Sequence, residues 1–376
     1  MKVKEKVFII DDDQMIIEVL KRILESTYNV NYAMDNKNII DILRVEKPDI
    51  ILLDILMPGD DGYIIIKEIK GVNELKDIPV IFITGLTDIS EKVKAFHAGG
   101  VDYITKPFEK EEVLGRIKIH LELRRQYTVL KELNTKIHEE LSLASNIQRA
   151  MMPSTSFELD GISVRTKYFP YIEIGGDFYD VIRINNGRYL VALFDVMGHG
   201  IPASLYTLML KSELMHHVHE GSTPSDILNK IKHHFAKIVP DYCFITGVTI
   251  LIDTINKYLI YANAGHPYPI YYNSKMKKIT EFEKSNIMIS SEKNSYVDER
   301  VDYSTGDRVI IYTDGLVDQN PKFKDYPDPS RFLIEKMTKH INQPLGSMIC
   351  GVIEELSINR EQRFKDDATI MAIEFT

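Results

Sequence analysis

The chain has 376 residues, 44% hydrophobic and 27% charged, values typical of a globular protein with room for two or three domains. A formal net charge of -9 disfavours general binding to nucleic acid or anionic membranes. No apolar run approaches the roughly 20 residues of a membrane span, the N-terminus lacks a signal-peptide cleavage pattern, and neither cysteine lies in a CxxC motif. We therefore expect a cytoplasmic protein without nucleic-acid or membrane partners.

The first 108 residues alternate short apolar runs with helix-like periods. The predicted strands are VFII, DIILLD, PVIFIT and VDYIT. The predicted helices are MIIEVLKRILE, NIIDILRVE and YIIIKEIK. Because continuous apolar strands alternate with helices, this pattern predicts an α/β domain with a doubly wound, flavodoxin-like parallel sheet covered on both faces.

A different pattern runs through residues 109–152, where glycine is rare and proline absent. A 4-3 spacing predicts a heptad seam formed by Leu123, Tyr127, Leu130, Asn134, Ile137, Leu141, Ala144, Gln148 and Met151. A polar residue at an a position, here Asn134, is typical of two-stranded coiled coils. We favour a helix that forms a homodimer. Because the seam is imperfect near Ala144 and Gln148, one long helix packed on its own domain stays open as the alternative.

Residues 153–376 combine alternating strands with helical segments. The predicted strands are RYLVALFDV, FITGVTILID, KYLIYANAG and DRVIIYTDG. Helical patterns cover roughly 202–219, 224–238 and 330–356. These elements predict a mixed α/β domain with much antiparallel sheet.

Acidic residues follow two of the first predicted strands. Asp11 and Asp12 come just after VFII, and Asp54 ends DIILLD. Carboxyl ends of neighbouring parallel strands converge on one crevice, where such hard oxygen ligands suit Mg²⁺. Thr84 and Lys106 end later strands, and a hydroxyl, an ammonium and a metal around Asp54 could stabilise an acyl phosphate. A cis bond before Pro107 would aim the ammonium at the site. The alternative, acids that merely cap helices, would suffice for a lone aspartate.

Residues 1–122 resemble the receiver domain of two-component response regulators. The matching residues are the acid pair Asp11 and Asp12, the phosphoacceptor Asp54, the switch residues Thr84 and Tyr103, and Lys106. The resemblance implies that a histidine kinase or another phosphodonor phosphorylates Asp54, with Mg²⁺ held by Asp11, Asp12 and Asp54. Thr84 would then turn toward the phosphoryl group and Tyr103 would follow inward.

Aspartates also stand at strand ends across the C-terminal segment, most of them near glycines. They are Asp177 in IGGDFYD, Asp195 in LFDVMGHG, Asp314 in YTDGLVD, and Asp366 and Asp367 in FKDDAT. Carboxylates gathered in this way are unfavourable unless they bind cations. Two divalent ions bridged by Asp195 would satisfy them and could activate a water for in-line displacement at phosphorus. The alternative is a set of unrelated turn aspartates beside turn glycines.

Residues 153–376 resemble the bacterial metal-dependent serine/threonine phosphatases of the PPM class, in the branch named for stage II sporulation protein E. The motifs that carry the resemblance are GGDFYD, DVMGHG, NAGHP, YTDGLVD and DDAT, with LASNIQRAMMP ahead of the domain. The resemblance implies a mixed α/β sandwich with two Mn²⁺ or Mg²⁺ ions. Asp177, Asp195 and the carbonyl of Val196 would hold one ion. Asp195, Asp314 and Asp366 would hold the other, unless Asp367 takes the place of Asp366. The implied catalytic residues are Asp177, Asp195, Asp314 and Asp366.

The histidines give a weaker signal. His199 and His266 could contact the phosphate or the leaving group, but bracing of the turn is favoured for both. The histidines that suggest zinc at first sight are His216, His217, His219, His233 and His234. Because the sequence offers no second ligand cluster, we favour a solvated helix face for this set.

The sequence thus predicts a receiver domain over 1–122, a helical coiled-coil linker over 123–152 and a phosphatase domain over 153–376. The resemblances imply a response regulator in which phosphorylation of Asp54 controls a protein phosphatase. The implied substrate is a phosphorylated anti-anti-sigma protein, whose dephosphorylation would free a sigma factor. The alternative is a catalytically silent adaptor, gated by phosphorylation, that binds a sigma factor or its regulator.

Overall fold

The computed structural model describes residues 4–57, 60–85, 89–238, 240, 243–290, 295–317, 329–356 and 364–376. The chain divides into two compact units, Met1–Ile137 and His138–Thr376. Among the described residues, no helix is both long enough and apolar enough to cross a membrane.

The first unit is built on a parallel sheet with the strand order β2-β1-β3-β6-β7. Its strands are β1 (Lys6–Ile10), β2 (Asn29–Ala33), β3 (Ile50–Asp54), β6 (Val80–Thr84) and β7 (Asp102–Thr105), and a short pair is formed by β4 (Leu56–Met57) and β5 (Asp60–Asp61). Its helices are α1 (Gln14–Leu24), α2 (Ile39–Glu46), α3 (Gly62–Gly71) and α4 (Ile89–His97), followed by the start of α5 (Lys110–Met151). Apolar clusters lie on both faces of the sheet, which confirms the doubly wound prediction.

Besides the short strands β4 and β5, the sequence prediction for this unit lacks strand β2 and helix α4. Strand β2 lies at the sheet edge, and none of its five residues is fully buried, so its sequence NVNYA has no continuous apolar run. Helix α4, with the sequence ISEKVKAFH, is short and has no continuous apolar run. Tertiary context, rather than the local pattern, determines both elements.

Helix α5 is continuous over 42 residues, which confirms a helical linker. Val113 and Ile117 near its start are fully buried in the first unit. In its middle, Leu123, Leu130 and Ile137 are 55%, 66% and 53% exposed. Near its end, Gln148 is buried again, now within the second unit. The predicted seam therefore has two parts: an exposed stretch and a final stretch that packs on its own domain.

The second unit is a sandwich of two antiparallel sheets. One has the order β10-β11-β12-β13-β16 and the other the order β15-β14-β17-β18-β9-β8. The strands are β8 (Ser156–Leu159), β9 (Ile162–Phe169), β10 (Asp177–Asn185), β11 (Arg188–Val196), β12 (Ile245–Asp253), β13 (Tyr258–Ala264), β14 (Ile270–Asn273), β15 (Lys278–Glu281), β16 (Glu299–Asp302), β17 (Arg308–Tyr312) and β18 (Ala368–Phe375). An apolar core fills the space between the sheets.

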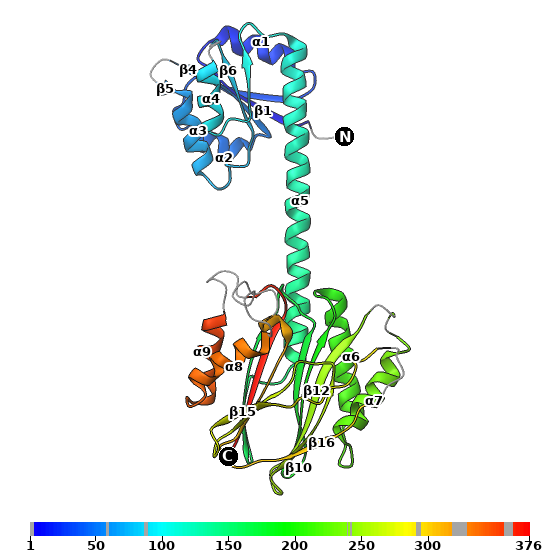
Figure 1. Cartoon of the computed structure of the whole chain (residues 1–376). Coiled ribbons are helices and arrows are strands. Elements are labelled where there is room, and N and C mark those ends of the chain that lie inside the picture. The colour runs from blue at the N-terminus through cyan, green and yellow to red at the C-terminus, as the bar shows by residue number, and fades with distance from the viewer. Residues whose placement is uncertain are drawn as a thin grey trace. The chain divides into compact units, whose positions relative to one another are not determined.

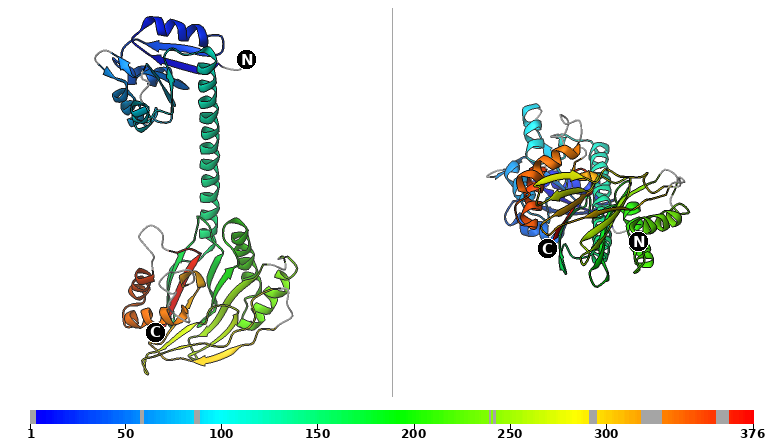
Figure 2. Two further views of the ribbon diagram at one scale, coloured as in Figure 1. Left: turned by 45° about the horizontal axis from the view of Figure 1, so that its top comes forward. Right: turned by 60° about the horizontal axis from the view of Figure 1, so that its bottom comes forward.

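Helices cover both outer faces of this sandwich, as Figures 1 and 2 show. Helices α6 (Ile201–His217) and α7 (Pro224–Phe235) pack on the first sheet. Helices α8 (Pro329–His340) and α9 (Leu345–Leu356) pack on the second. The sequence pattern predicts one helix over 330–356, but α8 ends at His340 and Pro344 directly precedes α9, a position that tolerates proline. The predicted mixed α/β sandwich is otherwise confirmed.

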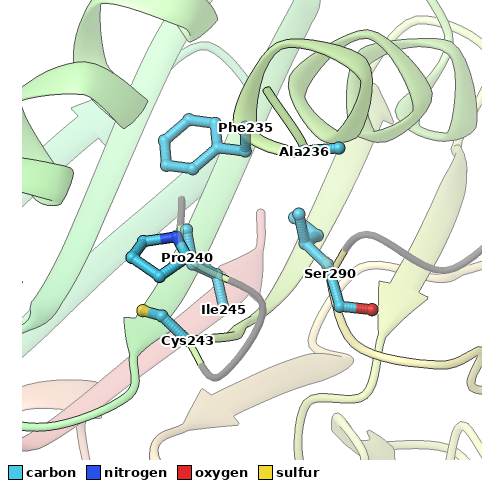
Figure 3. A pocket seen from close by; sticks show the side chains of 7 residues that line it. Phe235, Ala236, Pro240, Cys243, Ile245 and Ser290 are labelled. Atoms are coloured by element: carbon cyan, nitrogen blue, oxygen red, sulfur yellow. The ribbon is translucent and has the colours of Figure 1, made fainter. Parts of the chain in front are cut away.

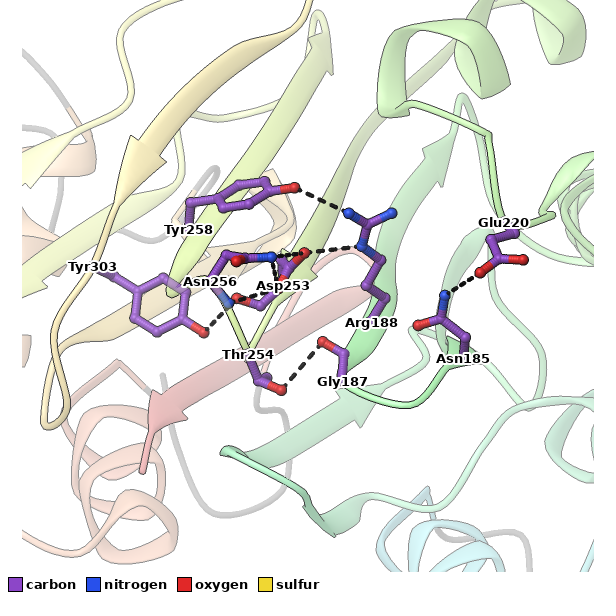
Figure 4. Close-up of polar contacts among 9 residues, drawn as sticks. All are labelled: Asn185, Gly187, Arg188, Glu220, Asp253, Thr254, Asn256, Tyr258 and Tyr303. Carbon is purple, nitrogen blue, oxygen red and sulfur yellow. Dashed lines mark hydrogen bonds and ion pairs between the residues drawn. The ribbon is translucent and has the colours of Figure 1, made fainter.

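A polar network closes the hairpin ends of the first sheet, at the end remote from Asp177 and Asp195 (Figure 4). Arg188 Nε donates to Asp253 Oδ2 at 2.9 Å, and the Tyr303 hydroxyl donates to the Asp253 carbonyl at 3.1 Å. The Asn256 N–H also donates to Asp253, at 2.8 Å. Because Arg188 of β11 is bonded to Asp253 of β12, the register of these two strands is fixed here and therefore also at the other end, where Asp195 lies.

Candidate functional site

The first candidate site lies at the carboxyl edge of the parallel sheet. Ligand oxygens of Asp11, Asp12 and Asp54 all lie within 4.8 Å of one another. Asp11 is completely buried and Asp54 is 5% exposed. Burial raises the pKa of Asp11, and hydrogen bonds from Asp13 and Lys106 only partly offset this. The donor set, three hard carboxylates with mutual repulsion, fits a divalent cation such as Mg²⁺.

Lys106 joins two of these acids. Its Nζ donates to Asp11 Oδ2 and to Asp54 Oδ2, at 2.9 Å in each case. Burial lowers the pKa of Lys106, but these hydrogen bonds outweigh burial, so the pKa lies above its ordinary value. The Lys106–Pro107 bond is cis, as the sequence analysis anticipates.

The two predicted switch residues lie on neighbouring strands. Thr84 ends β6 and is 2% exposed. Tyr103 lies on β7, and its ring packs edge-on against Phe96 of α4 with a centroid distance of 6.1 Å. Gly62, at the start of α3, faces the backbone of Asp54, since a Cβ there would approach the Asp54 carbonyl oxygen to 2.4 Å. This glycine leaves room for the main chain beside the phosphoacceptor candidate.

The second candidate site lies at the end of the sandwich where β10 begins and β11 ends. Asp177 and Asp195 are paired across these two strands. Asp314 opens a short 3-10 helix (Asp314–Leu316) just after β17, and Asp366 and Asp367 precede β18. The fold therefore gathers residues from both sheets at one end, as the sequence predicts.

Asp177 is the most enclosed of these acids, with no exposed surface. Its Oδ2 accepts hydrogen bonds from Thr313 Oγ1 at 2.8 Å and from Thr369 Oγ1 at 2.5 Å. Its Oδ1 is buried without a hydrogen-bond partner in the described part of the chain. An orphaned carboxylate oxygen of this kind is unfavourable by itself and fits a metal ligand.

Electrostatic repulsion supports the same interpretation. Burial raises the pKa of Asp195 well above its ordinary range, and the negative charges of Asp314, Asp366 and Asp367 raise it further. Burial and the charge of Asp195 likewise raise the pKa of Asp177. The acids are thus close enough to destabilise one another's charged forms, which divalent cations would neutralise.

Asp366 and Asp367 differ sharply in their contacts. Asp367 is 3% exposed, and its carboxylate accepts hydrogen bonds from the N–H of Tyr171 at 2.7 Å and of Gly176 at 2.6 Å. Asp366 is half-buried and accepts from the N–H of Asp367 at 2.8 Å. Asp367 is therefore committed to the backbone of the loop before Asp177, whereas Asp366 keeps one oxygen for another ligand.

Three positions in these motifs require glycine because neighbouring atoms lie too close for a Cβ. A Cβ at Gly175 would come within 2.4 Å of the Asp367 carboxylate, and one at Gly176 within 2.8 Å of the Val196 carbonyl oxygen. A Cβ at Gly315 would lie 1.9 Å from the Asp367 carbonyl oxygen. These glycines let the acid-bearing segments pack directly on one another.

Several residues around the site are absent from the sequence prediction. Thr313 and Thr369 donate hydrogen bonds to Asp177. The only signal for them in the sequence is that Thr313 precedes Asp314 and Thr369 follows Asp367 by two residues.

Asp180 is not part of the acid cluster: it is buried and accepts from Lys211 Nζ on α6 at 2.6 Å. This ion pair holds α6 on β10.

The two motif histidines occupy different environments. His266 is 3% exposed; its backbone N–H donates to Asn263 Oδ1 at 2.8 Å, and its ring Nδ1 lies 3.0 Å from Thr246 Oγ1. Burial lowers its pKa to about 3, so it braces the turn as a neutral ring. His199 is exposed and packs edge-on against Tyr171.

Two of the pockets on this unit bear on its chemistry. An open pocket adjoins Asp314 and includes Tyr268, Ser285 and Arg331 in its lining. A small pocket under the end of α7 is lined by Phe235, Ala236, Pro240, Cys243, Ile245, Ile289 and Ser290 (Figure 3). No charged residue is among those described lining residues, so the small pocket suits neither phosphate nor a metal ion.

Comparisons with known proteins find a match for each of the two units. The family model for stage II sporulation protein E matches residues 185–376, and the response regulator receiver domain model matches residues 7–118. Phosphoserine phosphatase RsbP of Bacillus subtilis (strain 168) is 26% identical over 242 residues, which are 63% of this chain and 57% of that protein. The chain thus aligns with little more than half of that relative.

Two solved structures share the fold of the second unit. The SiaA-PP2C domain of Pseudomonas aeruginosa superposes with a TM-score of 0.57 at 22% identity, covering 65% of this chain and 99% of that one. The PP2C phosphatase domain of SpoIIE from Bacillus subtilis, with a fragment of its regulatory domain, gives a TM-score of 0.50 at 16% identity, covering 58% and 64%.

Proposed function

The chain belongs to the stage II sporulation protein E family and carries a response regulator receiver domain, and from this premise we propose that it is a receiver-controlled, metal-dependent protein phosphatase. Its substrates are phosphoserine or phosphothreonine residues. The observation that carries the proposal is the convergence of Asp177, Asp195, Asp314 and Asp366 at one end of the sandwich, with a buried oxygen of Asp177 left unpaired among the described residues.

The resemblance to the phosphatase family supplies the proposed ligand sets, and the grouping of the acids at one end of the sandwich supports them. Asp177, Asp195 and the Val196 carbonyl hold one Mn²⁺ or Mg²⁺, and Asp195, Asp314 and Asp366 hold the other. When bound, the ions supply an activated water and neutralise charge on the phosphoryl oxygens. Thr313 and Thr369 fix the orientation of Asp177, as outer-shell partners do at metal sites. The pocket beside Asp314 offers room for the phosphorylated segment, and Arg331 gives it a cationic side chain.

The receiver site controls this reaction in our proposal. Asp54 accepts a phosphoryl group from a histidine kinase or another phosphodonor, with Mg²⁺ at Asp11, Asp12 and Asp54. Lys106 already contacts Asp54 and neutralises part of its charge. Rearrangement of Thr84 and Tyr103 then alters the surface that packs on α5.

We assign the exposed stretch of α5 to contact with a second copy of the chain. Leu123, Leu130 and Ile137 are each more than half exposed and recur with heptad spacing. Sedimentation velocity of the full chain, with and without acetyl phosphate, tests this assignment. A dimer that Leu130→Lys disrupts supports it, and a monomer under both conditions overturns it.

By family resemblance, the substrate is a phosphorylated anti-anti-sigma protein. The deciding experiment measures hydrolysis of p-nitrophenyl phosphate and of a phosphoserine protein with Mn²⁺, before and after phosphorylation of Asp54. Metal-dependent turnover that changes on phosphorylation supports a receiver-controlled phosphatase. No turnover in either state favours the second candidate, a silent adaptor that binds a sigma factor or its regulator.

A further inference from the structure

A cluster of metal-ligating side chains lies away from both sites. Glu213 and His217 are one helical turn apart on α6 and therefore share a face. His234 reaches the same place from α7. The candidate ligand atoms of these three residues lie within 4.8 Å of one another. We propose that Glu213, His217 and His234 form a binding site for Zn²⁺ that joins α6 to α7.

The distances within the cluster suit a small cation. Glu213 Oε2 is 3.0 Å from His217 Nε2 and 2.7 Å from His234 Nδ1. Zinc bonds of about 2.0–2.1 Å in a tetrahedral arrangement place ligand atoms about 3.3 Å apart. To reach this spacing, Glu213 would move about 0.3 Å away from the His217 nitrogen and about 0.6 Å away from the His234 nitrogen. Two imidazoles and one carboxylate form a donor set that zinc uses, with one position left for water.

His217 provides a separate observation. Its Nε2 is buried and makes no well-formed hydrogen bond within the described part of the chain, although Glu213 lies nearby. A buried ring nitrogen 3.0 Å from a carboxylate oxygen is unfavourable unless a proton or a metal lies between the two atoms. Zn²⁺ satisfies all three groups at once.

The helices that carry the ligands are already held together by apolar packing. Leu210 and Leu214 of α6 share a core cluster with Ile231 and Phe235 of α7. At the loop after α6, Glu220 accepts a hydrogen bond from Asn185 Nδ2 at 2.9 Å (Figure 4). The ligands are therefore positioned by packed elements, which lowers the cost of forming the site.

This site is distinct from the aspartate centre. Helix α6 begins at Ile201, next to the Asp195 motif, and Glu213 lies 12 residues further along it. At 1.5 Å per residue, this separation is about 18 Å along the helix axis. From the sequence alone we favour a solvated face for the histidines, and exposed His216, His219 and His233 agree with that interpretation. The close approach of His234 to Glu213 on another helix is visible only in the fold.

Zinc competition tests the proposal on the full chain. The metal-stripped protein is first saturated with Mg²⁺, which occupies carboxylate sites, and Zn²⁺ is then titrated against a chromophoric chelator. We expect one tightly bound Zn²⁺ per chain, weakened at least about tenfold in Glu213→Gln and in His234→Asn. His233→Ala is the matched control, because its side chain is the next one on α7 and contacts Lys237 instead. It should bind Zn²⁺ like the wild type.

A second measurement separates loss of ligand from loss of fold. Zn²⁺ should raise the melting temperature of the wild type and of Asp195→Ala, but not that of Glu213→Gln. Zinc binding that survives both Glu213→Gln and His234→Asn, or that is lost in Asp195→Ala, overturns the proposal. Equal weakening in His233→Ala also overturns it. None of these outcomes depends on phosphatase activity.

Discussion

Gln148 and Gly175 are joined by a pair of hydrogen bonds. The Gln148 Nε2 donates to the Gly175 carbonyl at 2.8 Å, and its Oε1 accepts the Gly175 N–H at 3.3 Å. The same Nε2 also donates to Thr207 Oγ1 of α6 at 3.0 Å. The end of the linker helix is thus bound to the loop that carries Asp177, two residues beyond Gly175. A displacement of the end of α5 would therefore act directly on the loop that carries a proposed metal ligand.

Gln148→Ala should weaken this link. Loss of a buried amide leaves the Gly175 groups and Thr207 short of partners, at a cost of about 1–3 kcal/mol in the free energy of unfolding. We expect a higher Mn²⁺ concentration for half-maximal phosphatase activity and a smaller response to Asp54 phosphorylation. The control is Gln126→Ala, on an exposed stretch of the same helix. Unchanged Mn²⁺ dependence and regulation in Gln148→Ala would exclude a role for the amide in coupling.

Asp366 and Asp367 should respond differently to the same substitution. Asp366→Asn removes a proposed metal ligand, so Mn²⁺ affinity should fall about 10- to 100-fold or more with little change in melting temperature. Asp367→Asn weakens two charge-assisted hydrogen bonds to Tyr171 and Gly176, so it should lower the melting temperature. Calorimetric Mn²⁺ titration and thermal unfolding of both variants check this. A normal Mn²⁺ affinity in Asp366→Asn would move the assignment to Asp367.

The acidic residues of the candidate site could be predicted from the sequence, but the residues that hydrogen-bond to them or to their loop could not. Asp177, Asp195 and Asp314 stand out because each lies at a strand end near a glycine, a pattern that is local. Gln148 and Thr369 do not, since an amide in a heptad seam and a threonine at the start of a strand are common. Their roles depend on contacts across 27 and 192 residues.

Dependence on distant contacts also explains why some secondary-structure elements were not predicted. Strand β2 is an edge strand with no continuous apolar run, and neighbouring β1 decides its conformation. In contrast, β3 and β6 are fully buried and were predictable from composition alone. The roles of the site residues stay predictions, and the following substitutions test them.

The two acid sites should be separable. Asp195→Ala should reduce phosphatase turnover by more than about 100-fold, because it removes the ligand proposed to bridge both ions. It should leave acetyl-phosphate labelling of Asp54 intact. Asp54→Ala should abolish labelling and regulation but keep the basal turnover. Phos-tag electrophoresis and phosphate release, measured on both variants, check this. Loss of both activities in either variant would contradict two independent sites.

His266 should make the second unit sensitive to acid. Burial lowers the pKa of His266 to about 3, whereas an unfolded chain has a histidine pKa near 6.5. Between these pH values, the unfolded state binds a proton that the folded state excludes. The contribution of the neutral His266 ring to the free energy of unfolding is therefore fully present above pH 6.5. It falls as the pH is lowered toward 3. At about 1.4 kcal/mol per pH unit, the loss reaches about 2 kcal/mol at pH 5.

Urea denaturation at pH 7 and pH 5 measures this effect. Between the two pH values, the wild type should lose about 2 kcal/mol more stability than His266→Gln, which has no ring to protonate. His199→Gln is the control, because exposed His199 lies in a neighbouring motif and keeps contact with water. It should follow the wild type. If His266→Gln loses as much stability as the wild type, the buried ring is not the group that titrates, and other groups must account for the acid sensitivity.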